Sequence, residues 1–304
     1  MAYLLKRIGV MLLCLLGATF IVFFILHLTG DPTNLLLPDD TTPAEREIFR
    51  QEMGFDRPLT EQYLDFLSGL SKGDFGYSYR YHEPALKIVL ERLPATIELM
   101  LAAVVLLLLI TIPIAIYSVR SESKIVQGLY MGVTFLGQSI PGFVLGINLI
   151  LLFSVKLHWL PPGSREHGLK SLVMPAAVLA LYGAPQMIRV LRTSLASVMD
   201  MDYVLKARAI GQSEFKVMIL HVFRNALIPF ITVLGVQIGI LLGGSVITET
   251  VFSWPGLGQM MVQAIENRDY PVVQAGMLIS AFFIMAINLI VDLLYAVIDP
   301  RIQY

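Results

Sequence analysis

Residues 99–119 read LMLAAVVLLLLITIPIAIYSV, a run of 21 residues without a charged side chain. A helix of about 20 apolar residues is long enough to cross the roughly 30 Å hydrocarbon core of a membrane. Because hydrocarbon offers the backbone no hydrogen-bond partner, a crossing segment must be a helix or part of a closed barrel, and a run this long is typical of a helix. The segment therefore predicts a transmembrane helix.

Five other runs reach or approach the same length, and together they contain one charged residue, Asp292. The chain is 56% hydrophobic and 15% charged, with a mean hydropathy of +0.71, which is too apolar for an ordinary soluble domain. We predict an all-α integral membrane protein with six transmembrane helices. The five further runs cover residues 8–26, 125–155, 171–188, 225–248 and 272–298.

The first run follows a basic start, as the core of a secretory signal peptide would. It is 19 residues long, however, and no A-x-A-like cleavage site follows it, which favours a helix that is retained. The single cysteine, Cys14, lies inside this run and allows no disulfide within the chain.

The basic residues predict the orientation, because short cytoplasmic loops carry an excess of lysine and arginine. With the amino terminus inside, the inner segments hold eleven basic residues and the two short outer loops hold four. We therefore predict a multi-pass protein of the cell inner membrane with both termini in the cytoplasm.

Three regions follow from this topology: a transmembrane helix at 1–30, an extra-cytoplasmic helical segment at 31–94, and a five-helix transmembrane domain at 95–304. The second region carries twelve acidic and seven basic residues. Thr42 and Glu45 have the spacing of a capping box, and Pro43 occupies the first helical position between them. We expect a small ordered cap there.

The inner loop at about 192–224 has the most informative pattern in the chain. Residues 196–209 predict an amphipathic helix, Gly211 suits the left-handed residue that ends it, and Ser213 would cap a second helix starting at Glu214. An amphipathic connector lying on the lipid headgroups is the alternative interpretation. If the loop docks into a partner, the side chains available for it are Tyr203, Ala207, Ile210, Phe215 and Val217.

The loop sequence, DYVLKARAIG at 202–211 followed by HVFRNALIP at 221–229, resembles the EAA loop of ABC importer permeases of the dipeptide, oligopeptide and nickel group. In the broad motif a glutamate stands where this chain has Leu205, and the proline that corresponds to Pro229 lies closer to the glycine. The resemblance covers essentially the whole chain. Its other motifs are GDP at 30–32, GFDRPL at 54–59, GDFG at 73–76, RLPAT at 92–96, WLP at 159–161, FSWPGLG at 252–258, RDYP at 268–271 and DPR at 299–301.

This resemblance implies a type I ABC importer permease fold with an extra-cytoplasmic helical insertion after the first helix. The implied partners are a second homologous permease in a heterodimer, two ATP-binding subunits, a periplasmic or lipid-anchored solute-binding protein and the lipid bilayer. The implied solute is a di- or oligopeptide, with a nickel chelate, another metal chelate or glutathione as alternatives. The implied ATPase-coupling residues are Asp202, Tyr203, Ala207, Arg208, Gly211, Ser213 and Glu214.

The chain has no G-x-x-x-x-G-K-[ST] phosphate loop, so we expect no cofactor in it, and ATP and magnesium would be bound by partner subunits. Its five histidines lack metal-ligand spacing, and we predict neither a metal site nor a catalytic residue nor a nucleic-acid partner. An ion-coupled secondary carrier and a membrane anchor for an enzyme complex are the rival functions. An ion-coupled carrier should have paired charges at mid-membrane and interrupted helices in matching positions of two halves, and the sequence shows neither clearly.

Two weaker groups of candidates complete the prediction. Gln138 and Gln237 are polar at membrane depth and could line a translocation pathway. Gly239 belongs to a glycine stripe at every fourth position, which favours close helix packing first and pore lining second. On the outer side, contact with a solute-binding protein or a purely structural turn is predicted for Trp254, Arg268, Asp269 and Tyr270.

Overall fold

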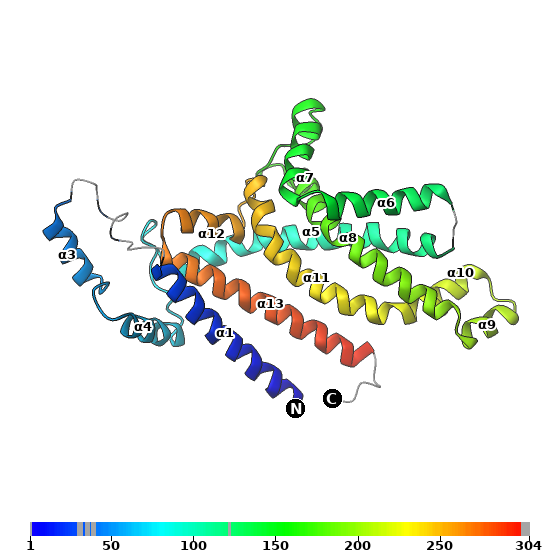
Figure 1. The fold of residues 1–304 in the computed structure, drawn as a ribbon, viewed down its shortest axis with the longest axis horizontal. Coiled ribbons are helices and arrows are strands. Elements are labelled where there is room, and N and C mark those ends of the chain that lie inside the picture. The colour runs from blue at the N-terminus through cyan, green and yellow to red at the C-terminus, as the bar shows by residue number, and fades with distance from the viewer. Residues whose placement is uncertain (1, 29–32, 34–36, 38–40, 121–122, 299–304) are drawn as a thin grey trace. The chain divides into compact units, whose positions relative to one another are not determined.

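The computed structural model describes residues 2–28, 33, 37, 41–120 and 123–298, and within these ranges it is helical apart from turns and one isolated bridge between Tyr77 and Pro84 (Figure 1). Five of the described helices are long and apolar enough to cross a membrane, and a bent pair adds a sixth span if the pair counts as one. This confirms the predicted all-α membrane fold. The predicted motifs at 30–32 and 299–301 lie outside the described residues.

The predicted span at 125–155 is not one straight helix. Helix α6 (Lys124–Ser139) ends before Pro141, and α7 (Gly142–Leu149) continues into a π-helical turn, η1 (Ile150–Lys156), after a bend of 112°. Ile140 is extended at φ −108°, ψ 122°, as expected of a residue that precedes proline. The break follows because Pro141 offers no N–H group and disfavours the helical conformation before it.

The chain divides into two compact units, and the first comprises residues 1–96 and 255–285. Its helices are α1 (Ala2–Leu28), α3 (Pro43–Glu52), α4 (Leu59–Ser71), the start of α5 (Ala85–Arg120), α12 (Leu257–Glu266) and most of α13 (Tyr270–Ile298). Val89, Leu257 and Val273 are buried together in its core. The predicted outer segment therefore shares a core with residues of α12 and α13.

Two contacts show how the predicted cap is ordered. The capping box is confirmed, because Thr42 Oγ1 accepts from Glu45 N while the Glu45 carboxylate accepts from Thr42 N. The Thr42 hydroxyl also donates to the Glu45 carboxylate at 2.7 Å, and this hydrogen bond, followed by the one from Thr42 N, lowers the pKa of Glu45. Helix α4 is tied to α1, since the Thr19 and Tyr63 hydroxyls lie 3.0 Å apart and Tyr63 packs against the Phe23 ring.

The second unit comprises residues 97–254 and 286–304, and α8 (Leu169–Met199) packs against α6, α7 and α11 (Arg224–Val251) within it. Helix α8 contains Pro185, which cannot donate to the Leu181 carbonyl one turn earlier. That carbonyl oxygen lies only 2.0 Å from where a Cβ on Gly137 would be. Glycine at 137 is therefore required for α6 to approach α8 this closely.

Candidate functional site

The coupling-loop candidate forms a compact helix-turn-helix knuckle, which we define as residues 200–224. Helix α8 continues through Met199, and the new helix α9 spans Asp202–Ala209. The single helix predicted at 196–209 is therefore wrong: Met201 is extended at φ −78°, ψ 144° and separates the two helices. Asp202 begins α9, where a carboxylate interacts favourably with the helix dipole.

The turn after α9 has the predicted chemistry. Gly211 adopts φ +81°, the left-handed conformation that side-chain-bearing residues disfavour, and its N–H donates to the Arg208 carbonyl. Nothing lies within 4 Å of a Cβ added to Gly211, so backbone conformation rather than space requires glycine. Ser213 Oγ accepts from Lys216 N and caps the next helix, α10 (Glu214–Lys216).

Two side-chain pairs bridge the turn. Arg208 Nε donates to Glu214 Oε1 at 3.0 Å, and His221 Nε2 lies 2.9 Å from Gln212 Oε1. The first pair joins the end of α9 to the start of α10, and the second ties the turn to a π-helical segment, η2 (Val217–Phe223). The sequence predicts Arg208 and Glu214 as separate coupling residues but does not indicate that their side chains form an ion pair. Both pairs therefore link the turn to the elements that flank it.

The inner face of the knuckle is a small apolar core. Val204 and Ala207 on α9 are buried, as are Val217, Met218 and Val222 on η2, and the two elements are in contact. Ala207 is 5% exposed and Val217 is fully buried. The expectation that these two could dock into a partner is therefore wrong. Their role is to hold α9 against the start of the next span.

The outer face of the knuckle is apolar and open. Ile210 is 68% exposed and Phe215 is 77% exposed, one on each side of Gly211, while Tyr203 and Leu205 are also exposed on α9. Exposed large apolar groups that are contiguous and rimmed by charges indicate a protein or membrane contact. Lys206 and Lys216 are also exposed and neighbour these apolar residues along the chain. The knuckle has the features of a docking surface and no arrangement for bond-breaking chemistry.

The pathway candidates do not form one site in the structure. Gln138 is exposed near the end of α6, whereas Gln237 is buried on α11, and its amide occupies the space beside Gly183 of α8. Gly239 is half-buried on α11. The Gln237–Gly183 contact is the kind of close helix packing that small residues allow.

Three of the four outer candidates are buried. Trp254 is fully buried, and Tyr270 belongs to the buried core of the first unit. Asp269 is 1% exposed, and its carboxylate accepts from Ser78 Oγ and from the Tyr79 and Arg80 N–H groups. Arg268 is half-buried with a positive φ of 50°. The Asp269 carboxylate thus fixes the loop at 77–84 against the start of α13.

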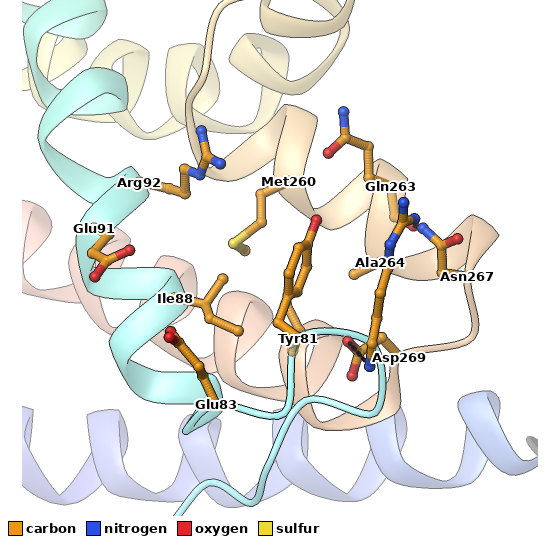
Figure 2. A pocket seen from close by; sticks show the side chains of 12 residues that line it. Tyr81, Glu83, Ile88, Glu91, Arg92, Met260, Gln263, Ala264, Asn267 and Asp269 are labelled. Carbon is orange, nitrogen blue, oxygen red and sulfur yellow. Dashed lines mark hydrogen bonds between the residues drawn. The ribbon is translucent and has the colours of Figure 1, made fainter. Parts of the chain in front are cut away.

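Tyr79 belongs to the loop that the Asp269 carboxylate holds. Its burial, followed by the charge of Asp269, raises the pKa of the Tyr79 phenol. Beside this loop lies a pocket of about 200 Å³ between the loop, α5 and α12, which the sequence did not indicate (Figure 2). Among the residues that the structure describes, no cluster of three or more His, Cys, Asp or Glu side chains could hold a metal ion.

Comparisons with known proteins agree with these features. The chain is 39% identical to the oligopeptide transport system permease protein AppB of Bacillus subtilis (strain 168), covering 100% of this chain and 99% of that protein. It is 33% identical to the dipeptide transport system permease protein DppB of Escherichia coli (strain K12), covering 99% and 98%. The secondary carrier and the membrane anchor are therefore not supported.

Solved structures show the same fold at low sequence identity. A chain of the inward-facing MetNI methionine ABC transporter superposes with a TM-score of 0.58 at 16% identity, covering 70% of this chain and 96% of that one. Family models match residues 1–100, as the N-terminal part of a binding-protein-dependent transport system membrane component, and residues 110–304. Together with the full-length relatives, these matches show that the chain, an integral membrane protein, belongs to the family described as binding-protein-dependent transport system inner membrane components.

Proposed function

We propose that this chain is the permease subunit of an ATP-driven importer of di- or oligopeptides. The full-length relatives carry the names of oligopeptide and dipeptide transport permeases, which supports a peptide as the solute. Those names give no support to the alternatives, import of a nickel chelate, another metal chelate or glutathione. The chain would provide the path through the membrane and break no bond in the solute.

The exposed apolar surface of the knuckle is the observation that supports the proposal for energy coupling. It presents Ile210 and Phe215 to solvent on a turn that is fixed from both sides, in a chain whose sequence has no phosphate loop. A separate ATP-binding subunit would dock there and transmit its closure to α8 and α11, which flank the knuckle. ATP and magnesium would be held by that subunit.

The complete transporter, in this proposal, contains a related permease as the second half of a heterodimer, two ATP-binding subunits and a periplasmic or lipid-anchored solute-binding protein. The excess of basic residues in the inner segments supports placement of the knuckle and both termini in the cytoplasm and of residues 31–94 outside the inner membrane.

Uptake into proteoliposomes tests the proposal. Proteoliposomes that contain the complete transporter are expected to accumulate labelled peptides. The peptide-bound solute-binding protein is added on the outer side of the transporter, and ATP is supplied on the side of the ATP-binding subunits. Omitting the ATP-binding subunits should stop uptake, because this chain supplies no nucleotide site of its own. A proton or sodium gradient serves as the matched alternative energy source. Uptake driven by that gradient without ATP would contradict the proposal.

A further inference from the structure

One helical segment of the second unit turns sideways from its neighbours. We call it the arm and define it as residues 142–159, which comprise α7, η1 and the turn after them. The helical part of the arm is bent by 112° from α6, and Figure 1 shows α7 turning away from the direction of α6. Membrane-spanning helices are tilted on average by about 20° from the membrane normal. With α6 at that tilt, the arm is closer to the membrane plane than to the normal.

The base of the arm packs against the ends of two spans. Leu145 is buried in one cluster with Met174, near the start of α8, and Phe252, directly after α11. Gly146 lies so close to α11 that an added Cβ would be 3.1 Å from the Phe252 ring. In the proposed topology the start of α8 and the end of α11 are on the outer side of the membrane. The arm therefore leaves the other helices at the outer boundary of the bilayer.

The side of the arm that faces away from this cluster is apolar and exposed. Residues 142–155 contain no charged side chain, and Lys156 is the first one. A contiguous exposed apolar surface marks a contact with a membrane or with another protein. The rim of a protein interface is polar, and the apolar stretch of the arm offers no such rim. The exposed apolar side chains include Ile147, Leu151, Leu152, Val155 and Leu157.

The end of the arm has the residues that are typical of a membrane–water boundary. Trp159 is 67% exposed, and it follows Lys156 by three positions. Tryptophan is enriched at the headgroup level because its ring is apolar and its N–H group is polar. A lysine at the end of an apolar helix can extend its ammonium group to the same level. The order along the arm, aliphatic first and then Lys156 and Trp159, therefore matches the change from hydrocarbon to headgroups.

The local backbone holds the Trp159 ring in place. The Trp159 N–H group donates to the Phe153 carbonyl at 2.8 Å, and the two ring centres are 5.9 Å apart. His158 adopts φ +53°, a conformation that residues with a side chain rarely adopt. Such a backbone persists where the surrounding structure holds it, and it is often found at functional positions. The exposed position of the indole is thus a property of the fold.

We propose that the arm lies along the outer boundary of the bilayer, with its exposed aliphatic side chains in lipid hydrocarbon and Trp159 among the headgroups. The partner of this surface is the phospholipid of the outer leaflet. In this arrangement α6 carries the chain to the outer side, and the arm anchors the ends of α8 and α11 at the membrane surface. The inference rests on the proposed topology for the choice of leaflet, and it is independent of the solute.

Quenching of tryptophan emission by brominated phospholipids tests the level of Trp159. The assembled transporter is placed in nanodiscs of brominated lipid, and the quenched emission of the parent is compared with that of Trp159→Phe. The emission that this substitution removes should be quenched more by bromines near the headgroups than by bromines near the chain ends. Trp254→Phe is the matched control, because Trp254 is the other tryptophan of the chain and is fully buried. Its emission should be quenched much less.

A spin label tests the aliphatic part of the arm. After Cys14→Ser, a nitroxide is attached to Leu151→Cys or to the control Ile48→Cys before the transporter is assembled. Both positions are exposed and aliphatic, but Ile48 lies on α3, in the segment that is predicted to be outside the membrane. Collisions with oxygen, which concentrates in hydrocarbon, should dominate at position 151. Collisions with a water-soluble nickel complex should dominate at position 48.

Each other outcome contradicts the inference in a recognisable way. Dominant nickel collisions at position 151, or quenching of Trp159 by iodide instead of brominated lipid, would show a surface that faces water or the solute-binding protein. Protection from both reagents would show that a second permease covers the arm. Peptide uptake by the same parent complex is measured separately. Lipid contact without ATP-driven uptake would refute the proposed function alone, whereas uptake without lipid contact would refute only the inference.

Discussion

Replacing Gly211 with valine is expected to remove most of the solute-stimulated ATP hydrolysis while leaving the protein inserted in the membrane. Gly211 adopts φ +81° between α9 and α10. A left-handed conformation costs a residue with a side chain about 1–2 kcal/mol, which corresponds to a roughly 5- to 30-fold loss of the native turn. A β-branched residue is at the unfavourable end of that range. The measurement is ATP hydrolysis by the reconstituted transporter with loaded solute-binding protein.

Two variants control for general instability. Gly73 has almost the same conformation, φ +79°, with nothing within 4 Å of an added Cβ, but it lies in the outer cap. Gly73→Val therefore carries the same local strain and should leave basal ATP hydrolysis unchanged. Gly211→Asn should lose much less activity than Gly211→Val, because asparagine tolerates the left-handed conformation. Equal activity in Gly211→Val and the parent would refute the role of the turn.

Replacing Phe215 with alanine is expected to weaken the association of the ATP-binding subunit by roughly 30-fold or more. Phe215 is 77% exposed in the isolated chain, and the proposed docking would bury its ring. Truncation of a central aromatic side chain at an interface typically costs 2 kcal/mol or more, hence the estimate of about 30-fold. Retention of the ATP-binding subunit on the detergent-solubilised permease, titrated against subunit concentration, measures the loss.

Tyr77→Ala is the matched control for Phe215. Tyr77 is an exposed aromatic residue of similar size that lies in the outer cap. Its truncation should leave the association of the ATP-binding subunit unchanged. An undiminished affinity in Phe215→Ala would show that the exposed ring is not part of the docking surface, and the lipid-headgroup interpretation of the knuckle would then be favoured.

Local structural motifs could be predicted from the sequence. The capping box at Thr42, the left-handed Gly211 and the Ser213 cap all depend on residues within a few positions of each other, and all three are present in the structure. The apolar runs predicted the membrane class because span length is set by the bilayer. The break before Pro141 had a signal in the proline itself, but the unbroken apolar run favoured one helix.

Contacts between distant segments were not predictable from one sequence. Asp269 and Ser78 are 191 residues apart, and only the fold brings the carboxylate to the loop. Packing against η2 also decides which side of α9 is buried. The sequence alone therefore could not show that Ala207 is buried while Ile210 is exposed. The pocket lined by Arg80 and Arg92 combines a loop with two helices and for the same reason gave no local pattern.

Site-directed crosslinking gives the most direct test of the central claim, that a separate ATPase docks on the knuckle. The exposed native Cys14 is first replaced by serine, and a cysteine is then placed beside the intact Phe215 ring by Lys216→Cys or, as the control, by Tyr77→Cys. A bifunctional thiol reagent should join the Lys216→Cys chain to the ATP-binding subunit in the assembled transporter and should leave the Tyr77→Cys chain unjoined to it. No crosslink from Lys216→Cys in a complex that hydrolyses ATP and imports peptide would contradict the account.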